Sequence, residues 1–138
     1  MKKSFLFLLI LVSNLVLAQS PKSEKVKYVN VIQKVCSSQK GRQLVLKEVL
    51  SDSRCPEGVR CVWAGEIKVS VSIYEGKKLV NTEELVISEK NDLVNKEWFM
   101  KYLPLSQHNI KSINVVPYPK QGVTIDPIAY YIKLGYIK

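Results

Sequence analysis

Between residues 67 and 73 the chain alternates strictly, with Ile or Val at every odd position and Lys or Ser at every even one. A period of two residues places the apolar side chains on one face of a β-strand and the polar side chains on the other. Glu75 and Gly76 follow as turn residues, and residues 79–87 are patterned as a strand that returns alongside the first. This part of the chain is therefore predicted to form an antiparallel hairpin.

The composition after residue 18 extends this prediction to the rest of the chain. Residues 19–138 contain 16 Val, 10 Ile, 7 Tyr, 2 Trp and 1 Phe, against only 2 Ala and 9 Leu. β-Branched and aromatic side chains suit a pleated surface, whereas Ala and Leu favour helices. We expect an all-β fold, an antiparallel β-sandwich or small barrel of about six to seven strands. Further strands are predicted at residues 26–31, 43–49, 112–116 and 130–137, a loop is predicted at 51–58, and residues 91–105 fit either a short helix or an irregular strand.

The first 18 residues have the layout of a secretory signal peptide. A basic start precedes an unbroken apolar run at residues 5–12, and the small residue Ala18 stands immediately before the expected cut. The apolar run is too short for a stable transmembrane helix, and no Cys follows the cut to carry a lipid anchor. We expect residues 19–138 to form one exported β domain, periplasmic or extracellular, without a transmembrane span.

The charge of the chain is strongly positive but dispersed. There are 21 Lys and Arg against 12 Asp and Glu, which gives a formal net charge of +9. No Arg-rich cluster is present, and an exported protein rarely meets nucleic acid, so no nucleic-acid partner is expected. The dispersed charge indicates a basic surface that is simply solvated. The alternative interpretation is that this surface is weakly attracted to an anionic envelope or polysaccharide.

Three cysteines follow the signal segment, at Cys36, Cys55 and Cys61. A disulfide bond is the default in an oxidising compartment, and the Pro and Gly between the second and third cysteines let that short segment turn back on itself. We predict a Cys55–Cys61 bond, which the chain-entropy model values at about 2.4 kcal/mol. Cys36 then stays unpaired. It is open to three interpretations, namely a buried apolar residue, a reactive thiol near Lys34 and Lys40, or an intermolecular disulfide.

The sequence contains few residues suited to catalysis or metal binding. His108 is the only histidine, and the Cys-x5-Cys spacing differs from that of standard zinc motifs. No Ser or Cys stands in a strand-turn nucleophile motif, and there is no Gly-rich phosphate loop. We therefore expect no metal, no cofactor and no catalytic residue.

The most informative segment covers residues 52–66 and reads Asp-Ser-Arg-Cys-Pro-Glu-Gly-Val-Arg-Cys-Val-Trp-Ala-Gly-Glu. It resembles the Asp-Ser-Arg-Cys-Pro…Cys-Val-Trp-Ala-Gly motif of an uncharacterised family of small exported bacterial β-proteins. Residues 115–119 and 131–134 resemble the C-terminal half of the same family, so the resemblance extends over residues 42–138. It implies an exported β fold and brings no established activity, substrate or catalytic residue. Cys36 lies outside the pattern.

The motif also has a physical interpretation, in which its residues are structural. Asp52 can accept hydrogen bonds from nearby backbone amides, and Arg54 can pair with Asp52 or with Glu66. Trp63 is expected to pack against the disulfide as a plug of the core. Gly65 permits a bulge or a close backbone approach where the next strand begins.

The main functional hypothesis is a non-enzymatic binding or interaction module. A ring closed by a disulfide holds Glu57, Val59 and Arg60 in place, and a rigid loop loses little entropy when it binds. The expected partner is an unknown protein or an envelope polysaccharide.

Three alternatives remain open. The loop could act as a protease inhibitor that offers Arg60 or Arg54 to a trypsin-like pocket. Cys36, helped by His108, could serve a thiol-dependent redox or nucleophilic enzyme. The third alternative is self-association through edge strands or through Cys36. The sequence does not determine the oligomeric state.

Overall fold

The computed structural model describes residues 24–36 and 41–138. The predicted signal peptide at residues 1–18 lies outside the described residues. Within them the chain forms six strands in two three-stranded antiparallel sheets, together with one α-helix and three short 3-10 helices. The prediction of an all-β antiparallel fold is confirmed, and the architecture is an open sandwich and not a closed barrel.

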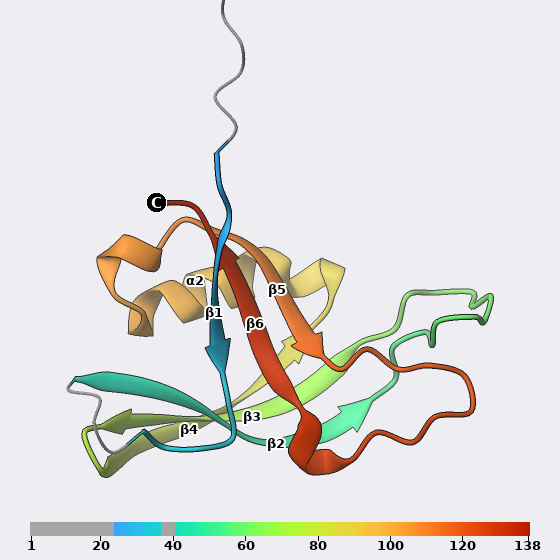
Figure 1. Cartoon of the computed structure of the whole chain (residues 1–138), viewed down its shortest axis with the longest axis horizontal. Helices are drawn as coiled ribbons and strands as arrows, with labels where there is room; N and C mark the ends of the chain where they lie inside the picture. Colours follow the sequence, from blue (N-terminus) through green and yellow to red (C-terminus); the bar gives the residue numbers. More distant parts are fainter. Residues whose placement is uncertain (1–23, 37–40) are drawn as a thin grey trace, which may run out of the picture.

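Sheet A has the strand order β1–β6–β5, and sheet B has the order β2–β3–β4. Figure 1 shows the strands of sheet A crossing steeply over one face of sheet B. β2 continues through Asp52, into the segment that the sequence predicted as a loop. The bounds are β1 Lys27–Val31, β2 Arg42–Asp52, β3 Ile67–Glu75, β4 Lys78–Ile87, β5 Ile110–Val116 and β6 Tyr131–Tyr136.

The alternating segment of the sequence forms the centre of sheet B. β3 lies between β2 and β4, and its odd-numbered residues from Ile67 to Ile73 are fully buried. Ser70 and Ser72 on the opposite face are buried as well, because neighbouring strands on both sides cover the small side chains of a central strand. The Ser72 hydroxyl lies 3.0 Å from that of Thr82 on β4. The hairpin prediction is confirmed.

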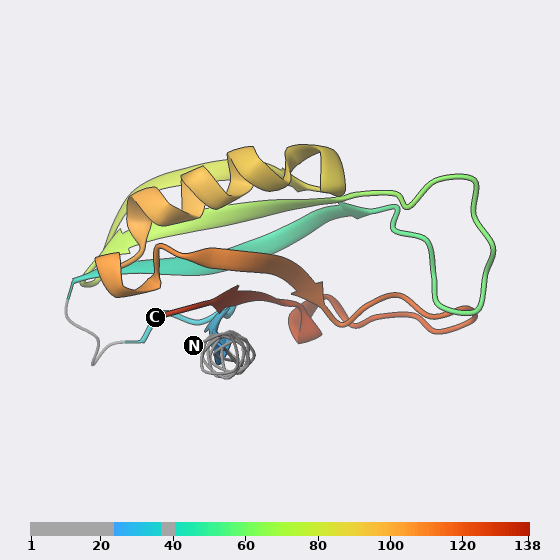
Figure 2. The ribbon, with the colours of Figure 1, turned by 90° about the horizontal axis from the view of Figure 1, so that it is seen from above.

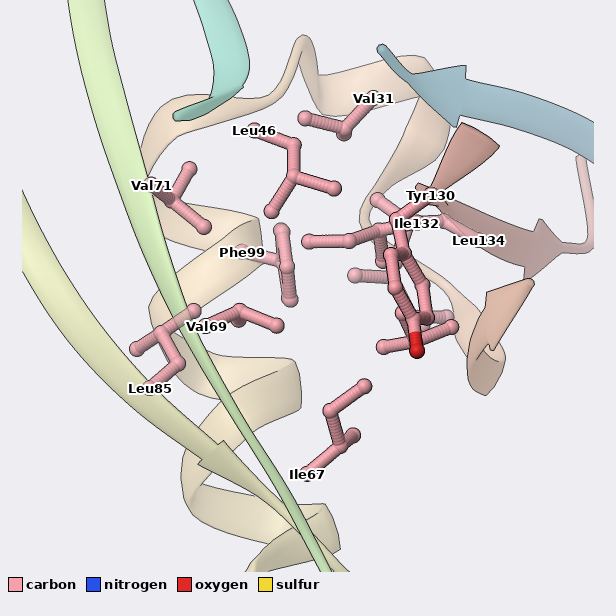
Figure 3. Packing of buried hydrophobic residues seen from close by; sticks show 12 residues of the cluster. Val31, Leu46, Ile67, Val69, Val71, Leu85, Phe99, Tyr130, Ile132 and Leu134 are labelled. Atoms are coloured by element: carbon pink, nitrogen blue, oxygen red, sulfur yellow. The ribbon is translucent and has the colours of Figure 1, made fainter. Parts of the chain in front are cut away.

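Residues 91–105, for which the sequence left helix and strand open, contain the helix α2 at Asp92–Tyr102. Sheet A covers only part of sheet B, and α2 lies beside it over the remaining part (Figures 1 and 2). Phe99 of α2 is fully buried, and Figure 3 shows its ring between Val71 of β3 and Ile132 of β6. The short helices are η2 Glu89–Asn91, η3 Leu105–Gln107 and η4 Pro127–Ala129. No helix among the described residues is long and apolar enough to cross a membrane.

Polar bonds attach α2 to the edge of sheet B. The indole of Trp98 donates a 2.6 Å hydrogen bond to Glu83 of β4, and the Tyr102 hydroxyl donates a 3.0 Å bond to the same carboxylate. The bond from Trp98 is the main cause that lowers the pKa of Glu83 below its ordinary value. Asn95 donates to the Val86 carbonyl at 2.9 Å. The two bonds to Glu83 join residues 15 and 19 positions apart, which explains why the local sequence did not decide between helix and strand.

Candidate functional site

Two loops project together from one end of the sandwich, and we call them the finger. The first loop covers residues 53–66, between β2 and β3, and the second covers residues 117–126, between β5 and η4. Figures 1 and 2 show both loops extending beyond the sheets. The Glu57 amide donates to the Pro119 carbonyl at 2.9 Å, and the Gln121 amide donates to the Glu57 carbonyl at 3.2 Å. The two loops are therefore joined by main-chain hydrogen bonds at Glu57.

The predicted disulfide closes the tip of the first loop. Cys55 and Cys61 are bonded, with their Cα atoms 5.9 Å apart. Within the ring, the Val59 amide donates to the Pro56 carbonyl and forms a turn. The disulfide prediction is confirmed, and the ring fixes residues 56–60 by a covalent constraint where no sheet is present.

A buried ion pair closes the base of the finger. Asp52 and Glu66 were the two acidic partners predicted for Arg54, and in the structure Arg54 pairs with Asp52. Its Nε and Nη2 atoms lie 2.8 and 2.6 Å from the two carboxylate oxygens, and its own amide donates to the same carboxylate at 3.2 Å. The side chains of Arg54 and Asp52 are only 9% and 13% exposed. Such a bidentate pair shielded from solvent is among the stronger polar contacts in proteins.

Arg54 also connects segments that are far apart in the sequence. Its guanidinium donates to the carbonyls of Val115 and Pro117, and it lies 4.9 Å from the centre of the Tyr118 ring. The hydroxyl of the buried Tyr130 donates to Asp52 at 3.1 Å. The pair therefore joins β2, the end of β5, the second loop and the residue between η4 and β6. Sequence reasoning missed the roles of Tyr118 and Tyr130, because only the fold brings them to the motif.

The surroundings of this ion pair shift the pKa values of Asp52 and Tyr130. Burial by itself raises the pKa of Asp52, but the hydrogen bonds and the charge of Arg54 outweigh burial and hold that pKa below its ordinary value. Burial, followed by the Asp52 charge, raises the pKa of Tyr130. At neutral pH the carboxylate is therefore ionised and the phenol is protonated, which is the arrangement that the hydrogen bonds require.

A tight backbone crossing lies next to the ion pair. The amides of Ser53 and Cys55 donate to the carbonyls of Glu66 and Ala64, each at 2.9 Å, so the two arms of the first loop continue the ladder of sheet B. Gly65 has a φ of +77°, and a Cβ atom there would lie 2.0 Å from the Ser53 carbonyl oxygen. Only glycine fits this position. The ladder ends at the pair of Cys55 and Ala64, and the chain between them has no strand opposite.

Trp63 is exposed, and the prediction that it plugs the core is wrong. Its side chain lies beyond the end of the ladder, where the body of the protein offers nothing to cover it, and 60% of the residue is accessible. Val62 is fully exposed and Val59 is also exposed. Three large apolar side chains therefore stand in water on one stapled loop.

The two charged residues of the predicted interaction loop have different surroundings. Glu57 lies 3.5 Å from Lys120 of the second loop and forms a solvent-exposed ion pair. Arg60 is exposed and forms no ion pair or hydrogen bond within the described part of the chain. Arg54 is bound to Asp52 at the base of the finger. Of the two arginines in this loop, Arg60 is therefore the one whose side chain is available to a partner.

Cys36 is unpaired and exposed, so its interpretation as a buried apolar residue is wrong. The segment after β1 leaves sheet A and runs along the outer edge of β2, where the Leu46 amide donates to the Ile32 carbonyl. The side-chain amide of Gln43 bonds both the amide and the carbonyl of Cys36. His108 lies 2.9 Å from the Leu103 carbonyl, and no described contact links it to Cys36. The structure therefore does not bring the expected thiol and base together.

A cleft of about 740 Å³ lies at the base of the finger. Five consecutive residues of β5, Ser112 to Val116, line it, which means that the strand presents its edge and not one face. The rest of the lining comes from both loops of the finger, from Tyr28 and Lys133 of sheet A, from Ile67 and Ile87 of sheet B, and from residues around the start of α2. Its charged groups have both signs, so the cleft does not single out one class of ligand.

Comparison of the chain with protein-family models, with curated proteins and with solved structures finds no match in any of the three. The resemblance of residues 52–66 to a family of exported β-proteins therefore stays a prediction.

Proposed function

We propose that the protein is an exported, non-enzymatic binding module and that the finger is its recognition surface. The observation that carries this proposal is the exposure of Val59, Val62 and Trp63 on one stapled loop. A single exposed apolar residue needs no explanation, but a group that includes a Trp at the end of a projection is typical of an interaction site.

The bracing of the finger supports the same function. The disulfide, the pair of Asp52 and Arg54 and the main-chain bonds between the two loops restrict the tip before any partner arrives. A surface ordered in advance loses less conformational entropy on binding, and this lost entropy is a large part of the cost of association. A protein partner is favoured over an envelope polysaccharide, because Trp and Arg are the side chains that contribute most to protein–protein interfaces.

Export is supported by the disulfide, since such bonds persist in oxidising compartments and are rare in the cytosol. It is further supported by the layout of residues 1–18. Membership of the exported β-protein family belongs to the same proposal and rests on the motif at residues 52–66.

The test starts from a photo-crosslinking residue in place of Val62 in the oxidised chain, irradiated in the envelope fraction of the cells that make the protein. The captured protein is identified and purified, and its Kd is measured with the unmodified chain, with Trp63→Ala and with the control Leu105→Ala. Leu105 is also a large, exposed apolar residue, but it lies on η3, between α2 and β5, and belongs to neither loop of the finger. We expect Trp63→Ala to weaken binding at least about 30-fold and the control to leave it unchanged.

Equal affinity of the unmodified chain and Trp63→Ala for the captured protein would contradict the proposal. A parallel measurement with isolated envelope polysaccharide uses the same variants. Binding that depends on Trp63 in that measurement alone would retain the finger as the site and replace the protein partner by a glycan.

A further inference from the structure

The tip of the finger is a convex segment with every residue exposed. Residues 57–64 form an unbroken exposed run, and Arg60 stands in it between the apolar Val59 and Val62. A projecting, pre-ordered loop fits a concave partner, and enzyme active sites are typically concave. An arginine on such a tip is complementary to a pocket with an acidic group at its base, and proteases that cleave after basic residues have such a specificity pocket.

We infer that the finger inhibits a serine protease that cleaves after arginine, with Arg60 as the residue that enters the specificity pocket. This inference rests on the proposed function, because it names the class of partner for the same loop. The structure also decides between the two arginines that the sequence offered. Arg54 is held by Asp52 and by the carbonyls of Val115 and Pro117, whereas Arg60 is without a partner in the described residues.

The position of the disulfide gives the loop a chemical means to resist cleavage. The peptide bond between Arg60 and Cys61 lies inside the ring that the Cys55–Cys61 bond closes. When the serine hydroxyl of the protease adds to the Arg60 carbonyl carbon, the bond to the Cys61 nitrogen breaks. The hydroxyl proton passes through the histidine of the protease to that nitrogen, which leaves an Arg60 ester and a Cys61 amine.

The Cys61 amine cannot diffuse away from this ester. It stays attached to the same ring through the sulfur of Cys55, and its arm of the loop is held by the bond between the Cys55 amide and the Ala64 carbonyl. A tethered nucleophile has a high effective concentration. The amine therefore adds back to the ester carbon, the peptide bond forms again, and the proton returns to the serine oxygen before water hydrolyses the ester.

The experiment uses trypsin as the probe and the oxidised chain from residue 19 to 138. The turnover of a small arginine amide substrate is followed as the protein is added. We expect slow turnover at micromolar protein, at least about 100-fold weaker inhibition by Arg60→Ala, and inhibition by Arg60→Lys within about 10-fold of the unmodified chain. Lys77→Ala is the matched control, because Lys77 is an exposed basic residue in the hairpin turn at the opposite end of sheet B. It should inhibit as well as the unmodified chain.

A second variant tests the ring itself. Cys55→Ser/Cys61→Ser removes the tether but keeps Arg60, and we expect trypsin to cut it between residues 60 and 61 as an ordinary substrate. Mass spectrometry detects that cut as two separate fragments, whereas the unmodified chain stays linked. Equal inhibition by the two forms would overturn the inference, since the ring would then contribute nothing.

Other outcomes separate this inference from the proposed function. Unchanged trypsin turnover, or rapid cleavage of the unmodified chain without inhibition, overturns the inhibitor. If the binding of a captured envelope protein still depends on Trp63, the finger remains a binding site, and only the assignment of its partner as a serine protease is wrong. If neither trypsin nor an envelope component depends on finger residues, both proposals fall.

Discussion

The body and the finger of this molecule are stabilised by different means. The body buries an apolar core between sheet B on one side and sheet A with α2 on the other. The finger buries almost no apolar side chain; a disulfide, a shielded ion pair and main-chain bonds between two loops hold it instead. Most of its large apolar side chains face water, and Ile125, near the end of the second loop, is the one that packs against the core.

This difference separates stability from recognition. Apolar residues in the body contribute to folding because folding removes them from water, whereas those on the finger remain available to a partner. A substitution at the tip should therefore change binding with little change in stability, and a substitution in the core should do the reverse. Two aromatic residues of the molecule permit a direct comparison.

The largest effect is expected from truncation of the buried aromatic residue. Phe99→Ala removes a fully buried ring that contacts both sheets and should lower the free energy of unfolding by about 3–5 kcal/mol. Trp63→Ala removes an aromatic residue of the finger and should change the free energy of unfolding by less than about 0.5 kcal/mol. Urea unfolding followed by circular dichroism measures both, and Phe99→Leu provides a milder variant. A loss from Trp63→Ala similar to that from Phe99→Ala would show that the finger is part of the core.

The same division explains how much of the fold could be predicted. β3 was predictable because its period of two residues is local and is followed directly by a turn. α2 was not, because Trp98, Phe99 and Tyr102 fit either structure locally. Contacts with Glu83 and with the part of sheet B that sheet A leaves uncovered favour the helix.

In the finger, the covalent staple was predictable and the exposure of Trp63 was not. A Trp two residues after a Cys usually belongs to a core, and its exposure depends on where the ladder of sheet B ends. The last bond of that ladder joins Cys55 to Ala64, the residue next to Trp63. The bonds from Arg54 to Val115 and Pro117 were also beyond prediction, because about sixty residues separate the partners. Side chains that meet only in the fold leave no local pattern.

A smaller loss of stability is expected from a substitution at Arg54, where the finger joins the body. Arg54→Met keeps the apolar stem but leaves the shielded Asp52 carboxylate and two carbonyls without their donor, and should cost about 3 kcal/mol. Arg60→Met, at the exposed tip, should change stability by less than about 0.5 kcal/mol. Urea unfolding gives the totals, and hydrogen exchange at the Cys55 and Glu57 amides shows whether the finger loosens first. Unchanged exchange at those amides in Arg54→Met would mean that the disulfide alone positions the finger.

The smallest effect is expected from acid, which acts on the polar braces and leaves apolar packing unchanged. Because the pKa of Asp52 in the folded protein is below its ordinary value, its contribution is complete above the unfolded-state pKa of about 4 and is lost as the pH falls through the folded-state value. The urea midpoint should therefore fall as the pH drops from about 5 to 2. Asp52→Asn should remove part of this dependence, while Glu57→Gln, which breaks only an exposed pair in the same finger, should retain it. If Asp52→Asn and the unmodified chain lose stability in parallel, Glu83 at the junction of α2 and β4 carries the acid sensitivity, and the polar bracing that matters at low pH belongs to the body.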